Sequence, residues 1–364
     1  MKGSSKRILR TDECLGTWRS HSSVLKILDR QIKMKNYISE LSRDDFLSYL
    51  EKLVTTTDAE WYDAKHRTIS IEEKELLNHI IPPDCPYCHF TNYISWGNTS
   101  DGIKRFKCKK CNKTFSPITN TLFDCHKIPI SEWLEFVLHL FEFHSVKTSA
   151  LDNRNMPSTG RYWLKKVFLA LRNYQDKILL GRNVWLDETL FPVIKSKEIL
   201  VGGKKLRGIS RNKISVATAT DGIHTVLIRG KTAKPTKRST WLAYSGHILN
   251  GTHIYHDDEN SHSVLMENIP NLTETIYPTK MLRGLKDKDN PMYKINHIHS
   301  LAKSFMKSHG SYDRNELQDW MNLFAFIINP PFDRRKKAVI LLKLIINTRE
   351  RIKTRDEKLK KHSD

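Results

Sequence analysis

The stretch NVWLDETLFPVI at residues 183–194 encloses one aspartate, Asp187, in apolar and aromatic side chains. Three more stretches downstream are equally short and rich in β-branched residues: KISVATAT at 213–220, HTVLIRG at 224–230 and GTHIYHD at 251–257. Runs of this kind, bounded by turn residues, are typical of β-strands. The four stretches together predict a β-sheet that carries Asp187 on a central strand.

Helical patterns interrupt and follow these strands. One helix is predicted over about residues 237–249, another begins near Tyr293, and further helices follow Arg314. Strands first and helices later, with one helix between strands, indicate an α/β domain, which we place at residues 179–332.

Four cysteines upstream form two C-x-x-C pairs, Cys85 with Cys88 and Cys108 with Cys111. The spacing between the pairs is typical of four-cysteine zinc sites. Zinc takes four such ligands in a tetrahedron, and four thiolates leave no open position for chemistry. The sequence therefore predicts a structural Zn²⁺ in a zinc ribbon. The remaining cysteines, Cys14 and Cys125, fall outside the pattern and are expected to be ordinary apolar residues.

The ribbon is also densely basic. Its basic residues are suited to contacts with phosphate, and they are Lys104, Arg105, Lys107, Lys109, Lys110 and Lys113. Its aromatic residues are expected to form a small ribbon core, and they are Tyr93, Trp96, Phe106 and Phe115.

The charge of the whole chain indicates the same partner. Sixty-one Lys and Arg residues against 40 Asp and Glu residues give a formal net charge of +21 over 364 residues. An excess of this size favours a polyanion. A basic protein of the membrane surface is a weaker alternative, because neither cysteine pairs nor enclosed aspartates serve that role. We find no membrane-length apolar run and no secretory signal, so we expect a cytoplasmic, DNA-associated protein without a membrane partner.

Helical patterns also flank the ribbon. SEWLEFVLHLFEFH at 131–144, with Ser131 as its cap, and RYWLKKVFLALRNYQ at 161–175 lie on either side of the polar break LDNRNMPSTG. Such a pair is compatible with a helix-turn-helix, although helical hairpins are often purely structural. The predicted segments are a helical N-terminal region at 1–80, the zinc ribbon at 81–125, a helix-turn-helix-like segment at 126–178, the α/β domain at 179–332 and a basic C-terminal helix or tail at 333–364.

Asp187 and Asp257 are the candidate catalytic carboxylates. A carboxylate among apolar strand residues is costly unless it faces a cleft or a metal ion. Mg²⁺ prefers oxygen ligands, and two such ions can promote an in-line phosphoryl displacement. The residues alone leave open that Asp187 is an ordinary strand-end residue and that HDDE at 256–259 is a helix-capping cluster.

Four features, in this order, resemble bacterial insertion-sequence transposases that carry a zinc ribbon ahead of a DDE-type catalytic domain. They are CPYC with RFKCKKCNKTFSPITNTLF; WLDETLF with KLRGISRNKISVATATD; IYHDDENSH; and NPMYKINHIHSLAKSFMKSHGSYDRNELQDWMNLFAFIINPP. The resemblance covers about residues 80–332. It implies an RNase H-like mixed sheet flanked by helices, with acidic residues on adjacent strand ends and on a following helix.

The resemblance also implies roles for individual residues. It makes Asp187 and Asp257 the first two catalytic residues and ligands of Mg²⁺ or Mn²⁺, places Asn296 at the third position, and puts Lys303 near DNA phosphate. Many relatives have Glu where this chain has Asn296, which can coordinate through its carbonyl oxygen but brings no charge. Other residues that could supply the missing ligand are Glu188, Asp258, Glu259, His297 and His299. Asp258 is the main rival of Asp257.

The function implied is that of a transposase, which binds the terminal repeats of a mobile element, cleaves DNA and transfers the strand to target DNA. Its partner is double-stranded DNA, on which a homodimer or larger assembly is expected. Two alternatives stay open: a non-catalytic DNA-binding regulator derived from a transposase, and a nuclease on the same fold.

Overall fold

The computed structural model describes residues 69, 71–124, 128–192, 198–206, 209–310 and 312–352. The chain divides into two compact units, residues 1–119 with 126–131 and residues 120–125 with 132–364, which are considered separately. Most of the predicted N-terminal helical region, Cys14, Cys125 and the end of the basic tail lie outside the described residues.

The first unit contains α3 (Ile71–His79) and a three-stranded antiparallel sheet, β1 (Tyr93–Asn98), β2 (Lys104–Cys108) and β3 (Thr114–Phe115). Tyr93 packs edge-on against the rings of Phe106 and Phe115, as expected of the ribbon core. Trp96 was wrongly assigned to this core, because it is 47% exposed. It lies three residues beyond Tyr93, and successive side chains of a strand alternate between faces.

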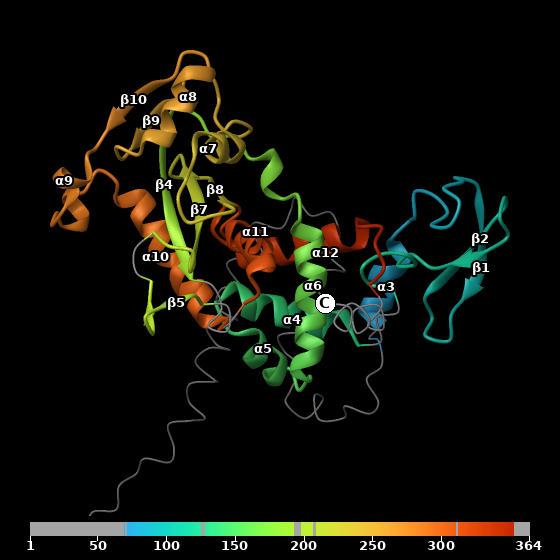
Figure 1. The fold of residues 1–364 in the computed structure, drawn as a ribbon. Coiled ribbons are helices and arrows are strands. Elements are labelled where there is room, and N and C mark those ends of the chain that lie inside the picture. The colour runs from blue at the N-terminus through green and yellow to red at the C-terminus, as the bar shows by residue number, and fades with distance from the viewer. Residues whose placement is uncertain are drawn as a thin grey trace, which may run out of the picture. The chain divides into compact units, whose positions relative to one another are not determined.

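The second unit is built on a five-stranded mixed sheet in the order β10-β9-β4-β7-β8 (Figure 1). The strands are β4 (Asn183–Pro192), β7 (Lys213–Thr220), β8 (Thr225–Arg229), β9 (His253–His256) and β10 (Thr273–Ile276). β4 runs antiparallel to β7 and parallel to β9, and β9 runs parallel to β10. All four predicted strands are present, and the sheet fits the expected RNase H-like domain. A short hairpin, β5 (Leu200–Val201) with β6 (Lys204–Lys205), follows β4.

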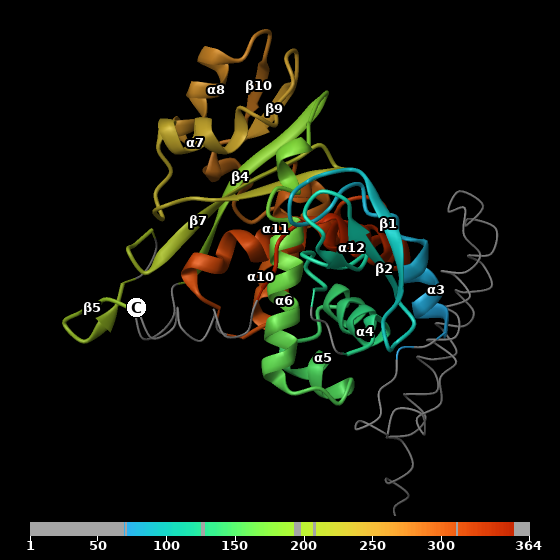
Figure 2. The ribbon, with the colours of Figure 1, turned by 90° about the vertical axis from the view of Figure 1, so that its right-hand side faces the viewer.

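Helices cover both faces of this sheet (Figure 2). Val184 and Leu186 of β4 point to the face covered by α7 and α8, where they join Tyr244 and Leu265 in the core. The alternate residues of β4 point to the face covered by α10 and α11. The helices after β8 are α7 (Lys237–Tyr244), α8 (Ser263–Asn268), α9 (Thr279–Leu282), α10 (Tyr293–Ser308), α11 (Leu317–Ile328) and α12 (Arg334–Asn347).

The helical segment ahead of the sheet contains one helix more than the sequence predicts. α4 (Ile130–Phe141) begins one residue before Ser131, which therefore does not cap it, and α5 (Val146–Asp152) and α6 (Pro157–Leu171) follow. Ser145 caps α5, since its side chain accepts from the backbone N–H of Thr148. Proline is favoured in the first turn of a helix, so Pro157 begins α6 inside the predicted polar break.

Short 3₁₀ turns complete the second unit: η2 (Gln175–Lys177), η4 (Asn260–His262), η5 (Asp287–Asp289) and η6 (Arg314–Glu316). In the described part of the chain, no helix has the length and apolar character needed to cross a membrane.

Candidate zinc site and catalytic pocket

The four cysteines of the ribbon lie together. Cys85 Sγ is 3.6 Å from Cys111 Sγ, and Cys88 Sγ is 3.6 Å from Cys108 Sγ. All four sulfur atoms lie within 4.8 Å of one another. A disulfide needs about 2.05 Å between sulfurs. Four sulfurs at 2.3 Å from a tetrahedral zinc lie about 3.8 Å apart, so the observed spacing fits a bound Zn²⁺.

The two cysteine pairs have the same backbone geometry. In the first, Cys85 N–H donates to Phe90 O and His89 N–H donates to Cys85 O. In the second, Cys108 N–H donates to Lys113 O and Asn112 N–H donates to Cys108 O. His89 and Asn112 each have φ of 56°. Repetition of one turn presents all four thiols to one point. His89 is used as a turn residue, with its ring on Asp84.

The thiols differ in their ease of ionisation. Burial raises the pKa of Cys85. Burial also opposes ionisation of Cys108, but the backbone N–H groups of Cys111 and Lys110, together with hydrogen bonds from Cys88 and Cys111, lower its pKa to about 7. Since zinc binds the thiolate, the lowered pKa of Cys108 favours its binding of the ion.

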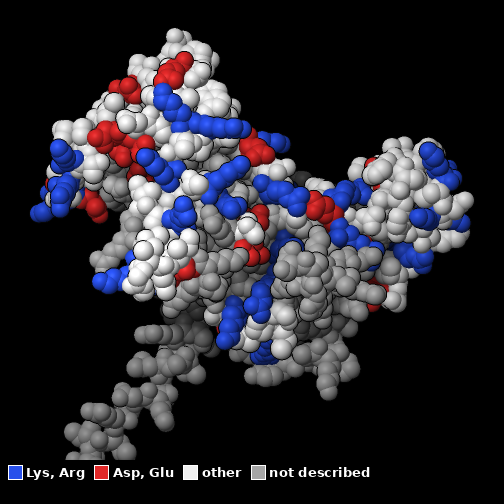
Figure 3. Space-filling view, viewed as in Figure 1, with Lys and Arg blue, Asp and Glu red and all other residues white. Residues whose placement is uncertain are grey.

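Lys and Arg side chains lie on the surface of the ribbon (Figure 3), and the predicted phosphate contacts are among the residues exposed there in whole or in part. Lys104, Lys109, Lys110 and Lys113 are exposed, and Arg105 and Lys107 are half-buried. Lysine ammonium groups lie over exposed aromatic rings, with Lys107 Nζ 4.3 Å from the centre of Trp96 and Lys113 Nζ 4.9 Å from that of Tyr87. The outward rings thus hold part of the basic surface in place.

Strand register brings Asp187 and Asp257 together in the second unit. β4 and β9 are parallel, and their last paired residues are Trp185 and Tyr255, whose rings stack with centroids 4.8 Å apart. Two residues farther along, Asp187 lies within β4 and Asp257 lies just past the end of β9, so both are placed on the face that Trp185 and Tyr255 share. The carboxylates are close enough for Asp257 to raise the pKa of Asp187.

Asp187 lies in surroundings that disfavour its charge. Burial, followed by the carboxylates of Asp257 and Glu188, raises the pKa of Asp187 to about 7. Its Oδ1 accepts the backbone N–H of Glu188 at 2.7 Å. A divalent cation would relieve the repulsion between these carboxylates, so the donor set fits Mg²⁺ or Mn²⁺.

Asp258 is placed differently from its neighbour. It is exposed, and its Oδ1 accepts from Thr279 Oγ1 at 3.3 Å. Asp257 Oδ1 accepts the backbone N–H of Glu259 at 3.2 Å and lies 3.8 Å from His262 Nδ1. The geometry therefore favours Asp257 over Asp258 as the partner of Asp187.

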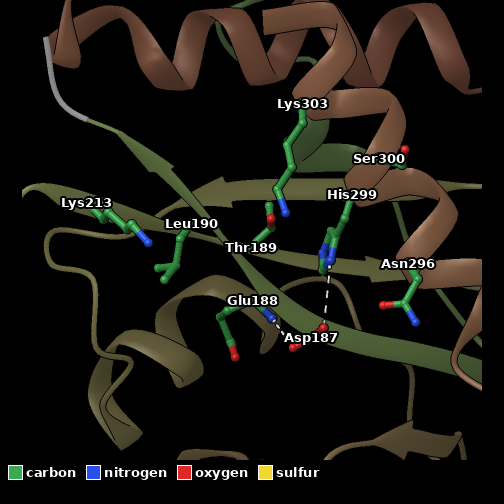
Figure 4. Close-up of a pocket in the computed structure, with 9 residues that line it drawn as sticks. All are labelled: Asp187, Glu188, Thr189, Leu190, Lys213, Asn296, His299, Ser300 and Lys303. Atoms are coloured by element: carbon green, nitrogen blue, oxygen red, sulfur yellow. Dashed lines mark hydrogen bonds and ion pairs between the residues drawn. The ribbon is translucent and has the colours of Figure 1, made fainter. Parts of the chain in front are cut away.

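Asp187 opens into a pocket of about 600 Å³ between β4, β7 and α10 (Figure 4). Its lining residues are Asp187, Glu188, Thr189, Leu190, Lys213, Asn296, His299, Ser300 and Lys303. The last four share one face of α10, because residues three and four apart on a helix are neighbours. The pocket therefore brings Asp187, Asn296 and Lys303 together. Asp257 is not in the lining and lies beside Asp187, just past the end of β9.

His299 is a buried member of this pocket. Its Nδ1 lies 3.7 Å from Asp187 Oδ2. Burial and the nearby charge of Lys303 lower the pKa of His299 to about 3. The ring is therefore neutral near pH 7, and its contact with Asp187 is not an ion pair.

The other residues that could replace a third acidic ligand have separate contacts of their own. Glu259 caps η4, where its side chain accepts from the backbone N–H of Ser261. His297 is exposed and stacks on Tyr293. Glu188 lines the pocket, but its carboxylate accepts from Tyr244 Oη at 3.2 Å and lies 3.3 Å from His262 Nε2.

Sequence reasoning did not identify Lys213, Tyr244, His256 or His262 near this site. Lys213 is the first residue of the strand KISVATAT and pairs with Pro192 of β4. Nothing in its local sequence distinguishes it from other strand-end lysines. The recurrence of histidine in HDDENSH was a usable signal, because it places two imidazoles around the candidate aspartate.

Comparisons with known proteins give little further information. No protein-family model matches the chain, and no curated protein matches it. Solved structures similar to it include the catalytic domain of Mos1 mariner transposase, at 13% identity and a TM-score of 0.24, covering 52% of this chain and 93% of that one. A pre-cleavage Mos1 transpososome matches at 12% identity and a TM-score of 0.21, covering 56% and 73%. At such TM-scores we draw no conclusion from these matches.

Proposed function

We propose that the chain is a DNA transposase with a structural zinc ribbon and a metal-dependent, RNase H-like catalytic domain. The observation that carries the proposal is that Asp187 of β4 and Asn296 of α10 face one open pocket with basic residues on its wall, and that Asp257, after the end of the adjacent parallel strand β9, lies beside Asp187. The motif resemblance in the sequence supports the same assignment independently of any single residue.

The two aspartates and Asn296 have complementary roles in this proposal. The aspartates supply charged oxygen ligands, and Asn296 supplies a neutral carbonyl oxygen from the helix face opposite them. Mg²⁺ or Mn²⁺ held there would stabilise the charge that develops on the attacking and leaving oxygens. The neutral ring of His299 packs beside Asp187 and limits the positions that its carboxylate can take.

The basic residues of the pocket suit a phosphodiester substrate. Lys213 and Lys303 line the wall, so a DNA phosphate entering the pocket gains charge neutralisation on two sides. The reaction proposed is in-line attack by water, which forms a new P–O bond and releases a 3′-hydroxyl. That hydroxyl then attacks a phosphorus of target DNA, forming one phosphodiester as another breaks.

Recognition of the element ends is assigned to the ribbon and to α5 and α6. Lysine and arginine contacts to phosphate supply affinity, and a smaller number of base contacts supply specificity. Since two ends are cleaved in one event, we propose a homodimer or larger assembly on double-stranded DNA.

The test is cleavage of labelled DNA that carries the ends of the encoding element, with Mg²⁺, with Mn²⁺ and with EDTA. Metal-dependent nicking at the ends is expected, with loss of nicking but not of end binding in Asp187→Ala and Asp257→Ala. Asp258→Ala is the matched control, because it removes an adjacent carboxylate that faces Thr279. Retained nicking in Asp187→Ala would refute the assignment.

The neutral Asn296 favours one alternative, a DNA-binding regulator that has lost catalysis. Tight end binding without nicking in any metal would support this regulator. In that case Asn296→Glu is the substitution to examine for restored cleavage.

A further inference from the structure

Two buried histidines lie next to the candidate aspartates. His256 is the last residue of β9, His262 ends η4, and they are 4% and 1% exposed. His256 Nε2 lies 3.1 Å from the carboxylate of Glu274, and His262 Nε2 lies 3.3 Å from that of Glu188. The Glu188 carboxylate also accepts from Tyr244 Oη. Each imidazole is therefore held by its own carboxylate.

These contacts determine which ring nitrogen of each histidine carries the proton. An ionised carboxylate only accepts hydrogen bonds, so each Nε2 carries the proton that it donates. The two Nδ1 atoms lie 3.1 Å apart. Either one proton or one metal ion can lie between them, and with a metal ion each Nδ1 presents its lone pair to that ion.

Three carboxylates surround the two histidines, and a single positive charge does not balance their negative charge. Asp257 Oδ1 lies 3.8 Å from His262 Nδ1, and Glu188 and Glu274 hold the outer ring nitrogens. Among the described residues, no lysine or arginine forms an ion pair with any of these three carboxylates. A single shared proton would leave two of the three negative charges uncompensated, whereas a divalent ion would leave one.

We propose that His256 Nδ1, His262 Nδ1 and the carboxylate of Asp257 form a second metal site, distinct from the ribbon. Their ligand atoms lie within 4.8 Å of one another. For metal–nitrogen bonds of 2.0–2.1 Å, a 3.1 Å separation gives an N–metal–N angle of about 100°, which lies between octahedral and tetrahedral values. Nitrogen ligands favour Zn²⁺ or Co²⁺ over Mg²⁺.

The surrounding contacts match those of histidine metal sites. A metal-binding histidine usually donates its other ring N–H to a carboxylate, which fixes its tautomer and orientation. Glu274 and Glu188 provide that contact for both rings. An ion there would tie the end of β9 to η4 and thereby fix Asp257. This site needs no DNA and no catalysis, so its failure is distinguishable from failure of the proposed transposase function.

The test is metal counting on the full-length chain, stripped with a chelator and titrated with Co²⁺ alone. Absorption spectra separate the two sites, because cobalt in the ribbon shows thiolate charge-transfer bands and cobalt on histidine and carboxylate does not. Native mass spectrometry after addition of Zn²⁺ gives the count. Counted on an Asp187→Asn background, which removes the ion of the catalytic pocket, the proposal expects two equivalents, one after Cys108→Ser and one after His262→Gln, with only the thiolate spectrum left in the latter.

A gentler variant keeps the test decisive if His262→Gln does not fold. Glu274 is 34% exposed, and Glu274→Gln should weaken the second Co²⁺ equivalent by about 10–100-fold. His253→Gln is the matched control on the same strand and should leave both equivalents unchanged. One equivalent on the Asp187→Asn background would overturn the proposal and indicate a shared proton. So would a second equivalent on that background that survives His262→Gln, since that ion would lie elsewhere.

Discussion

The ribbon and the catalytic pocket differ in where their candidate metal ligands come from in the sequence. The ribbon takes four sulfur ligands from residues 85–111, on two copies of one turn. The proposed catalytic ligands are the oxygen groups Asp187, Asp257 and Asn296, which come from β4, the end of β9 and α10. The first set is closed around its centre, and the second leaves a cavity of about 600 Å³.

In the proposed function, this difference separates a metal ion that stabilises the fold of the ribbon from one that takes part in the reaction. The ribbon has a small aromatic core, so we expect it to depend on a bound zinc ion to fold. The sheet has a larger apolar core, so we expect it to fold without an ion, although its carboxylates raise one another's pKa. Substitutions in the two regions should therefore have different consequences for stability.

The largest effect is expected from Cys108→Ser. Loss of one thiolate should release the ribbon's zinc and unfold the ribbon, because binding of a structural zinc contributes about 10–16 kcal/mol in small zinc domains. Zinc content and proteolysis between residues 85 and 115 measure this loss. Lys109→Ser, an exposed neighbour, should leave both unchanged. Full zinc content in Cys108→Ser would remove the contrast between the two regions.

Asp187→Asn should have the opposite effect on stability. The folded-state pKa of Asp187 is raised to about 7, so its ionisation costs stability that grows from pH 4 to pH 7 and then stays constant. Removing the charge should stabilise the metal-free protein above pH 7 by up to about 4 kcal/mol, at about 1.4 kcal/mol per pKa unit. Urea unfolding at pH 4, 6 and 8 measures this gain. A pH-independent difference would contradict the repulsion inferred here.

Asn296 provides a smaller effect within the pocket. Asn296→Ala removes a neutral oxygen and should weaken Mn²⁺ binding and cleavage by about tenfold, while Asn296→Asp adds a charge and should tighten Mn²⁺ binding. Calorimetry with Mn²⁺ and single-turnover cleavage measure the two quantities. His297→Ala, on an exposed part of the same helix, is the control. Equal Mn²⁺ affinity in all variants would exclude Asn296 as a ligand.

The smallest effect is expected from Lys303→Gln. Loss of one phosphate contact should weaken DNA binding a few-fold at low salt and reduce the slope of log K against log salt by about one. Lys280→Gln carries the same charge change on α9, outside the pocket lining, and serves as the comparison. An identical salt slope in both variants would place Lys303 away from DNA.

Local sequence was sufficient for the elements with strong patterns and failed where a pattern was short or mixed. KISVATAT and HIYH form the predicted strands, but β10 is the four-residue polar edge strand TETI, with no alternation to mark it. The helix predicted over about 237–249 ends at Tyr244. Trp96 was assigned to the core because it is aromatic. The alternation of side chains along β1 instead places it on the outer face, together with Ile94.

The sequence by itself determined the four-cysteine cluster, the strand that holds Asp187 and the basic character of the chain, because each depends on residues close together in sequence. Only the tertiary structure decided that Asp187 and Asp257 share one face, that α10 turns Asn296 and Lys303 toward them, and that His256 meets His262. These contacts between distant residues depend on the register of β4 with β9 and on the packing of α10 against β4. Such long-range pairings are set by burial across the whole domain, which no single motif encodes.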